Sequence, residues 1–179
     1  MIYMFLAEGF EEVEALAPLD LIRRAGLEIK TVGVGGKAIT GSHGIPVIAD
    51  MTDAEFSDTA PDMVILPGGM PGTKNLDASE TVHKAIADAV KNDAYLCAIC
   101  AAPMILGKLG LLKGKNAVSY PGFEKYLEGA IIPNKKVIRD GKIITAKGMG
   151  AGIEFGLAIV SVLKDEKTAD DLAVTTISK

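Results

Sequence analysis

The sequence lacks tryptophan, has only two cysteines and two histidines, and contains no block of like charge. The few cysteines and histidines are scattered, so they do not form the spacing of a metal site. The net charge of −4, with both signs mixed, argues against a dedicated nucleic-acid surface or an anionic-membrane surface. No Gly-x-Gly-x-x-Gly or phosphate-loop pattern occurs. We therefore expect no metal, no cofactor and no nucleic-acid partner.

Long hydrophobic runs and a secretory leader are also missing. The apolar start Met1–Leu6 has no basic residues before it, is too short for a signal peptide and is soon followed by Glu8. No apolar stretch reaches the length of a membrane span. Two cysteines without secretory features indicate a reducing compartment and free thiols. The expected location is the cytoplasm, with no membrane partner.

What the chain does contain is a regular alternation of strand and helix signals. Its 179 residues, 49% hydrophobic and 23% charged, fit one domain over residues 1–179. The expected strands are Ile2–Ala7, Leu27–Val34, Pro46–Ala49, Met63–Leu66, Tyr95–Ile99, Ala117–Ser119, Lys136–Arg139 and Lys142–Ala146, the last two joined at Asp140-Gly141. The expected helices are Glu11–Arg24 with a disturbance at Pro18, Ser79–Lys91, Ala101–Leu111, Ile153–Leu163 and Glu166–Val174.

This alternation predicts an α/β fold, with a mainly parallel sheet covered by helices on both faces as a three-layer sandwich. In such sheets, ligands bind at the carboxyl ends of the strands near a topological switch point. Three segments follow strand ends and carry chemistry: Glu8–Glu14, Gly68-Gly69 and Cys100. We expect them to meet in one crevice.

Cys100 is the first candidate for catalysis. It lies between an apolar strand and a helix-like run, where free N–H groups and the helix dipole favour a thiolate. The alternative is a buried, inert cysteine. Cys97 resembles the partner of a dithiol motif, but it should lie within the strand, so we assign it to the core.

Two further groups are candidate partners of the thiol. Gly68, Gly69 and the N–H of Ala101 can form an oxyanion hole, although Gly-Gly after a strand is often a plain turn. Glu14 has apolar neighbours on its helix face, so burial would raise its pKa and keep it protonated. Glu12 also has apolar neighbours, and periodicity alone does not separate the two.

Several segments together resemble the ThiJ/PfpI superfamily, and most closely its branch of parkinsonism-associated deglycase-like proteins, in the bacterial form. The matching segments are Ala98–Pro103, Leu66–Gly69, Glu11–Glu14, Arg23–Gly26 and Gly148–Gly150 with Glu154-Phe155. The resemblance covers nearly the whole chain in order. It implies a flavodoxin-like sandwich and a homodimer, with a reactive cysteine at a strained elbow, here Cys100, hydrogen-bonded by a protonated glutamate, here Glu14. The backbone donors of the family map to Gly69 and Ala101.

Three positions depart from the family pattern. Ala101 stands where the protease-like branch has a histidine, which weakens a peptidase interpretation. Tyr120 stands where human-type relatives place a histidine near the cysteine. His43 occupies the loop position at which relatives carry a basic residue across the dimer interface. Thiol activation must then depend on the helix end and Glu14, with Tyr120 and His43 as further pocket candidates.

Three functions remain open from the sequence. The first is an enzyme of stress defence, in which Cys100 attacks a small α-oxoaldehyde or an early glycation adduct on a protein or nucleotide. The second is a redox sensor or stress chaperone that uses oxidation of Cys100. The third is a conventional cysteine hydrolase or amidotransferase, which we place last because neither His43 nor His83 is near Cys100 in sequence.

Overall fold

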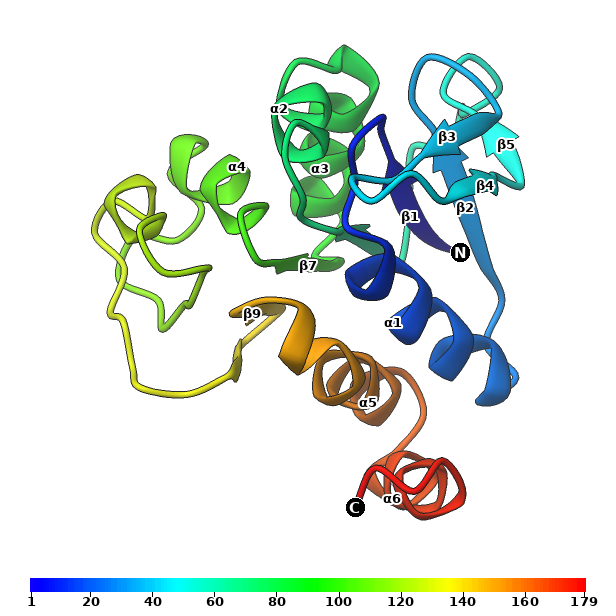
Figure 1. Ribbon diagram of the computed structural model, residues 1–179. Helices are drawn as coiled ribbons and strands as arrows, with labels where there is room; N and C mark the ends of the chain where they lie inside the picture. Colours follow the sequence, from blue (N-terminus) through cyan, green and yellow to red (C-terminus); the bar gives the residue numbers. More distant parts are fainter.

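The computed structural model describes residues 1–179 and is built around a seven-stranded sheet (Figure 1). The strands lie in the order β5-β2-β1-β6-β7-β9-β8, and all neighbours are parallel except β8 and β9. Their bounds are β1 Ile2–Leu6, β2 Ile29–Gly33, β5 Met51–Thr52, β6 Met63–Leu66, β7 Tyr95–Ile99, β8 Val137–Asp140 and β9 Ile143–Ala146. A separate antiparallel hairpin consists of β3 Ala38–Thr40 and β4 Pro46–Ile48.

Helices cover both faces of the sheet (Figure 1). On one face lie α1 Glu12–Arg24 and α5 Gly152–Leu163, with α6 Glu166–Thr175 packed outside α5. On the other face lie α2 Gly72–Asp77, α3 Glu80–Lys91 and α4 Pro103–Lys108. Two short 3-10 turns, η1 Glu124–Tyr126 and η2 Met149–Ala151, complete the fold. The flavodoxin-like sandwich predicted from the sequence is confirmed.

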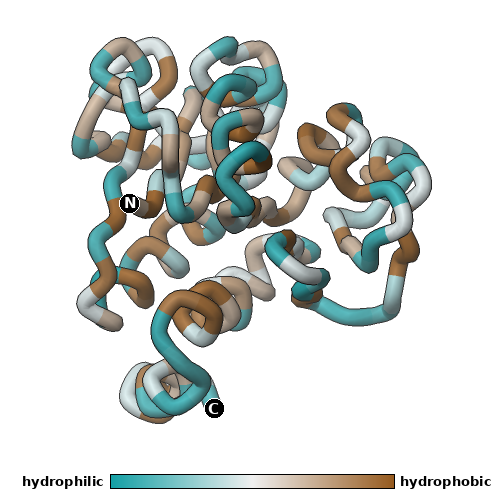
Figure 2. The backbone as a smooth tube through the Cα atoms, turned by 180° about the vertical axis from the view of Figure 1, so that it is seen from behind, coloured by the Kyte–Doolittle hydropathy of each residue, from teal (hydrophilic) through white to brown (hydrophobic).

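The central strand β1 shows why the sandwich has two cores. All five of its residues are buried, and alternate side chains point to opposite faces of a strand. Met4 belongs to the core beneath α1 and α5, and Phe5 belongs to the core beneath α2, α3 and α4. In Figure 2, α5 is mainly hydrophobic in colour, because it packs against α1 on one side and α6 on the other.

Four details of the expected elements are wrong. The segment Ala117–Ser119 is buried but not a strand, and it pairs only through Asn116 with Ile131. The hairpin turn lies at Gly141-Lys142 rather than Asp140-Gly141, because Asp140 still pairs with Ile143. The short elements β3, β5 and α2 have no clear periodicity and were not predicted. The expected helix Ala101–Leu111 is shorter, as described below.

Pro18, where we expect a kink or an opening of the hydrogen-bond ladder, lies inside α1. The helix continues to Arg24, and Pro18 lies directly against Gly156 of α5. A Cβ on Gly156 would approach the Pro18 Cα to 2.8 Å. The small residue lets the two helices meet closely, and the packing offsets the missing N–H of proline.

No helix of the chain is both long enough and apolar enough to cross a membrane.

The strand order places the topological switch point at β1. The chain runs from β1 to β2 on one side and then returns to β6 on the other. Ligands bind at the carboxyl ends of strands beside such a point. The segments after β1, β6 and β7 therefore share one edge of the sheet, and these are the segments that carry Glu14, Gly68 and Cys100.

Candidate active site

Cys100 occupies a strained turn directly after β7. Its φ of 65° lies in the left-handed region, which a residue with a side chain adopts only at a cost of about 1–3 kcal/mol. Two backbone hydrogen bonds hold the turn: the Cys100 N–H donates to the Ala146 carbonyl at 2.9 Å, and its carbonyl accepts from Tyr120 N–H at 2.7 Å. The side chain of Cys100 is partly exposed, whereas Cys97 is 1% exposed within the core. The core assignment of Cys97 is confirmed.

The helix after Cys100 begins later than the sequence predicts. The six-residue helix α4 starts at Pro103, with Ala102 as its N-cap. Proline favours the first helical position because it has no N–H to leave unpaired. Cys100 thus lies three residues before the helix rather than directly before it, and the dipole of so short a helix is weaker than we expected for the thiol.

Glu14 approaches the thiol from the first turn of α1. It is 1% exposed, its side chain hydrogen-bonds Cys100, and one carboxyl oxygen accepts the Gly68 N–H at 3.0 Å. Glu11 caps the same turn by accepting the Glu14 N–H at 2.7 Å. Gly68 is required by this contact, because a Cβ there would lie 2.5 Å from both the Cys100 Cβ and the Glu14 Oε2.

Burial shifts the ionisation of both acids. It raises the pKa of Glu14 from 4.5 to about 7, as the apolar surroundings foreseen from the sequence require. Burial also raises the pKa of the Cys100 thiol to about 12, and the nearby Glu14 carboxylate adds to that rise. Burial thus opposes the ionisation of the thiol that we expect from the helix end and Glu14. The two groups share one site, and a negative charge on either one disfavours a charge on the other.

Backbone N–H groups favour negative charge in this site. Those of Gly69 and Ala101 hydrogen-bond the Cys100 sulfur and lower its pKa. Gly69 has φ 92°, and a Cβ there would lie 2.4 Å from the Glu11 backbone N. The Met149 N–H likewise lowers the pKa of Glu14. The sequence indicated Gly69 and Ala101, but it gave no role to Met149, whose loop only the fold brings to Glu14.

Tyr120 lies beside the same carboxyl group. A Cβ placed on Gly148 would be 3.2 Å from the Tyr120 ring and 3.7 Å from the Glu14 Oε1, so ring and carboxyl border one space. Tyr120 is 51% exposed. Its ring therefore lies at the surface beside the Glu14 carboxyl.

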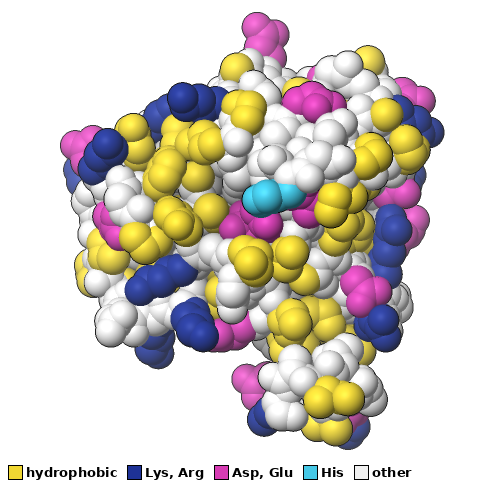
Figure 3. All heavy atoms as spheres, in the orientation of Figure 1, with side chains coloured by type: hydrophobic (Ala, Val, Ile, Leu, Met, Phe, Trp, Pro, Cys, Tyr) yellow, Lys and Arg dark blue, Asp and Glu magenta, His cyan; other side chains and the backbone are white.

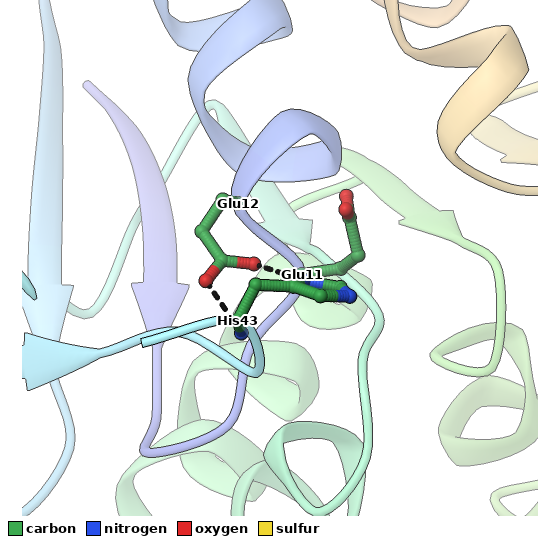
Figure 4. Close-up of side chains that lie close together, drawn as sticks. All are labelled: Glu11, Glu12 and His43. Atoms are coloured by element: carbon green, nitrogen blue, oxygen red, sulfur yellow. Dashed lines mark hydrogen bonds and ion pairs between the residues drawn. The ribbon is translucent and has the colours of Figure 1, made fainter. Parts of the chain in front are cut away.

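His43 is bonded to Glu12 (Figure 4). Its Nδ1 lies 2.9 Å from one Glu12 oxygen, and its backbone N–H donates to the other at 2.7 Å. These bonds lower the pKa of Glu12 to about 2, although burial opposes them, and Glu12 in turn raises the pKa of His43. In Figure 4 no hydrogen bond or ion pair joins the Glu11 carboxylate to the pair. Glu12 thus fastens the loop after β3 to α1, whereas Glu14 faces the thiol.

Glu11, Glu12 and His43 offer ligand atoms within 4.8 Å of one another, a set that the scattered sequence positions did not indicate. A metal ion there would have to displace the hydrogen bonds that already occupy both oxygens of Glu12. The group therefore serves as a fastening in this structure. Nothing in its chemistry requires a metal for the Cys100 site.

Comparisons with known proteins agree with this geometry. The DJ-1/PfpI family profile matches residues 1–162. Protein dj-1beta of Drosophila melanogaster is 32% identical over 173 residues, covering 95% of this chain and 92% of the relative. A relative in Caenorhabditis elegans named glutathione-independent glyoxalase DJR-1.2 is 28% identical, covering 92% of this chain and 89% of its own.

The structure of oxidized DJ-1 from Toxoplasma gondii superposes with a TM-score of 0.94 at 29% identity, covering 98% of this chain and 97% of that chain. The similarity therefore extends through the entire sandwich, including the strand ends that carry the cysteine and the glutamate. The chain belongs to the DJ-1/PfpI family.

Proposed function

We propose that the protein is a cysteine-dependent stress-defence enzyme that converts α-oxoaldehydes, or their early adducts on proteins or nucleotides, into hydroxy acids. The observation that carries the proposal is the close approach of the buried Glu14 carboxyl to Cys100 at a strained turn, where a Cβ on Gly68 would lie 2.5 Å from both the Cys100 Cβ and the Glu14 Oε2. A carboxyl whose pKa is near neutrality can both give and take a proton at working pH. The name of the Caenorhabditis elegans relative supports the same reaction class.

The proposed chemistry begins from the state of the pair in which the negative charge lies on sulfur and Glu14 is protonated. The thiolate adds to the aldehyde carbon, and the N–H groups of Gly69 and Ala101 stabilise the resulting oxyanion. Glu14 donates its proton to that oxygen and forms a hemithioacetal. For a glycation adduct, the same attack displaces the amine, which leaves with a proton.

The remaining steps move a hydride equivalent within the substrate. The Glu14 carboxylate removes the proton from the former aldehyde carbon, and a proton returns to the neighbouring carbon. The first carbon is thereby oxidised to a thioester while the second is reduced to an alcohol. Water then cleaves the thioester, which releases the hydroxy acid and restores the thiolate. The net reaction consumes one water and needs no external oxidant or reductant.

Steady-state formation of lactate from methylglyoxal tests this proposal. We expect Cys100→Ala to abolish turnover and Cys97→Ala to retain it, because Cys97 lies 1% exposed in the core. Equal rates for the wild type and Cys100→Ala would refute the enzyme. The purified protein should be assayed under reducing conditions, such as those of the cytoplasm in which we propose that it works.

A second candidate function is a redox sensor or stress chaperone. The oxidized state named for the Toxoplasma gondii relative favours it, as does the partly exposed thiol beside Gly69 and Ala101 N–H groups that can bond sulfinate oxygens. Mass spectrometry after peroxide treatment distinguishes it. A sensor gains oxygen at Cys100 at low peroxide and changes partner binding or chaperone activity, whereas methylglyoxal turnover stays at the level of Cys100→Ala.

We further propose that the protein works as a homodimer. Exposed apolar side chains gather beside the N-terminus of α1: Val13 is 43% exposed, Ile45 52%, Met149 54% and Ile153 45%. Isolated exposed apolar residues are ordinary, but a group of them indicates an interface. His43 lies beside Ile45 in this group and would then face the partner subunit.

A further inference from the structure

A hollow lies on the side of α2 and α4, and residues of the segments next to Cys100 line it. Its volume is about 340 Å³, which lies in the range of small-molecule sites. The side chains that line it are those of Met70, Lys74, Met104, Phe123, Lys125 and Tyr126. We call these six residues the lysine subsite.

Short backbone connections join the lysine subsite to the thiol. Met70 follows Gly69, whose N–H bonds the Cys100 sulfur. The Met104 N–H donates to the Ala101 carbonyl at 3.1 Å. The Phe123 N–H donates to the Tyr120 carbonyl at 3.0 Å. The lining of the hollow is therefore continuous with the segments that surround Cys100.

The lysines of the subsite have no acidic partner. Neither Lys74 nor Lys125 forms an ion pair, whereas the neighbouring Lys108 is bonded to Asp77. The carboxylate of Glu124, next in sequence to Lys125, accepts the Gly122 N–H at 2.6 Å. Two exposed cations thus remain available to an anion.

The rest of the lysine subsite is apolar and aromatic. The rings of Phe123 and Tyr126 lie 5.9 Å apart at an angle of 44°, and the Lys125 Nζ lies 5.1 Å from the Tyr126 ring. Met104 is 5% exposed and Met70 is 39% exposed. Figure 3 shows hydrophobic side chains gathered on the side of α2 and α4, with lysine or arginine side chains at their border. Such a surface suits a planar or apolar group that ends in a negative charge.

We propose that the lysine subsite binds the distal end of the substrate, an aromatic or apolar group that ends in a carboxylate or a phosphate. The reacting carbonyl would lie at Cys100, and the anion would lie between Lys74 and Lys125. Only the placement of the reacting carbonyl at Cys100 rests on the proposed function. It narrows the substrate class from any α-oxoaldehyde to those extended by an anionic apolar group.

Binding of stable hydroxy-acid products tests this inference without turnover. Isothermal titration compares lactate, mandelate, and mandelate with a carboxylate or a phosphate at the para position. We expect the para anion to tighten binding to the wild type about tenfold relative to mandelate, the gain of one charged contact. In the double variant Lys74→Gln/Lys125→Gln this gain disappears. The control Lys91→Gln/Lys135→Gln removes the same charge from exposed lysines outside the subsite. This control should retain the gain in binding.

A para anion that gives no gain in the wild type overturns the inference, as does a gain that survives in the double variant. The stronger of the carboxylate and phosphate ligands identifies the natural anion, and either one supports the subsite. Conversion of methylglyoxal separates the two proposals. Turnover without the anion effect removes only the lysine subsite, whereas the anion effect without turnover removes only the enzyme.

Discussion

In the proposed chemistry, Glu14 and Cys100 carry one negative charge between them. Glu14 is buried, and its pKa is raised to about 7, while burial and the Glu14 carboxylate raise the pKa of Cys100. Protonation of Glu14 removes the repulsion and leaves a donor that can bond the sulfur anion. We therefore expect the ionised sulfur and the neutral carboxyl to be one state of the pair, which the backbone donors stabilise.

Substitution of Glu14 separates its roles as a donor and as a charge. Glu14→Ala removes the hydrogen bond to sulfur, so the rate of alkylation of Cys100 by iodoacetamide at pH 7 should fall by about tenfold. Glu14→Gln keeps a neutral donor of similar shape and should change the rate less. The two rates are measured by mass spectrometry of the Cys100 peptide. The reverse ranking would contradict the donor role.

The close approach at Gly68 gives a second prediction at this scale. Gly68→Ala would place a Cβ 2.5 Å from the Cys100 Cβ, so the pair must separate, and methylglyoxal turnover should fall at least about 100-fold. Gly150→Ala is the matched control, because a Cβ there meets nothing within 4 Å. Circular dichroism checks that both variants fold. Unchanged turnover in Gly68→Ala would show that the contact is not needed.

Sequence reasoning identified the pair but could not fully describe it. Apolar neighbours indicated that Glu14 is buried, and they indicated the same for Glu12, which is 4% exposed. The two acids differ in their long-range partners, Gly68 for Glu14 and His43 for Glu12. Those contacts depend on the folding of loops far apart in the chain, so helical periodicity contains no information on them.

At the scale of elements, the N-terminus of α1 is held from two sides. On the side of the thiol, the Gly68 N–H donates a hydrogen bond to Glu14. On the other side lies the loop after β3, whose His43 N–H and Ser42 hydroxyl donate hydrogen bonds to Glu12. This fastening fixes the helix turn on which Glu14 is mounted. A disturbance of the loop should therefore reach the active site through α1.

Gly41→Ala tests the fastening. A Cβ on Gly41 would lie 2.3 Å from the Glu12 Oε1, so the carboxylate must leave its donors. We expect a loss of about 2 kcal/mol in the free energy of unfolding and a lower alkylation rate of Cys100. Gly36→Ala, where a Cβ meets nothing within 4 Å, should leave both unchanged. Urea denaturation measures the first quantity, and equal stability of the two variants would exclude the fastening.

The long buried elements were predictable and the short ones were not. The apolar runs that form β1, β6 and β7 are strands at or near the predicted bounds, and Ser79 caps α3 as expected by accepting the Val82 N–H. Helix α4 ends at Lys108, before Gly110, whose φ is 72°. The apolar run continues beyond that point because Leu112 packs in the core without being helical.

At the scale of the whole molecule, the sheet order brings the site together and leaves one apolar face uncovered. The strand ends of β1, β6 and β7 converge because these strands are neighbours, which the alternation of strands and helices suggested but could not prove. The uncovered face around Val13 and Ile153 lies outside the sandwich. A partner subunit is the means we propose to cover it.

Sedimentation velocity tests the proposed homodimer. We expect the wild type to sediment at twice the mass of the chain and Ile153→Lys to sediment as a monomer, because a buried unpaired charge disfavours association. The control Val174→Lys changes an apolar residue that is 64% exposed on α6, outside the proposed interface. A monomeric wild type at micromolar concentration would contradict the homodimer.

The measurement that tests the central claim most directly is a pH titration of thiolate absorbance in the Cys97→Ala protein, with Cys100→Ala as the blank. If the pair loses its first proton from sulfur while Glu14 stays protonated, the absorbance should rise with a midpoint below the ordinary thiol pKa of about 8.5. A rise only above the ordinary thiol pKa of about 8.5 would place the charge on Glu14 and contradict the account.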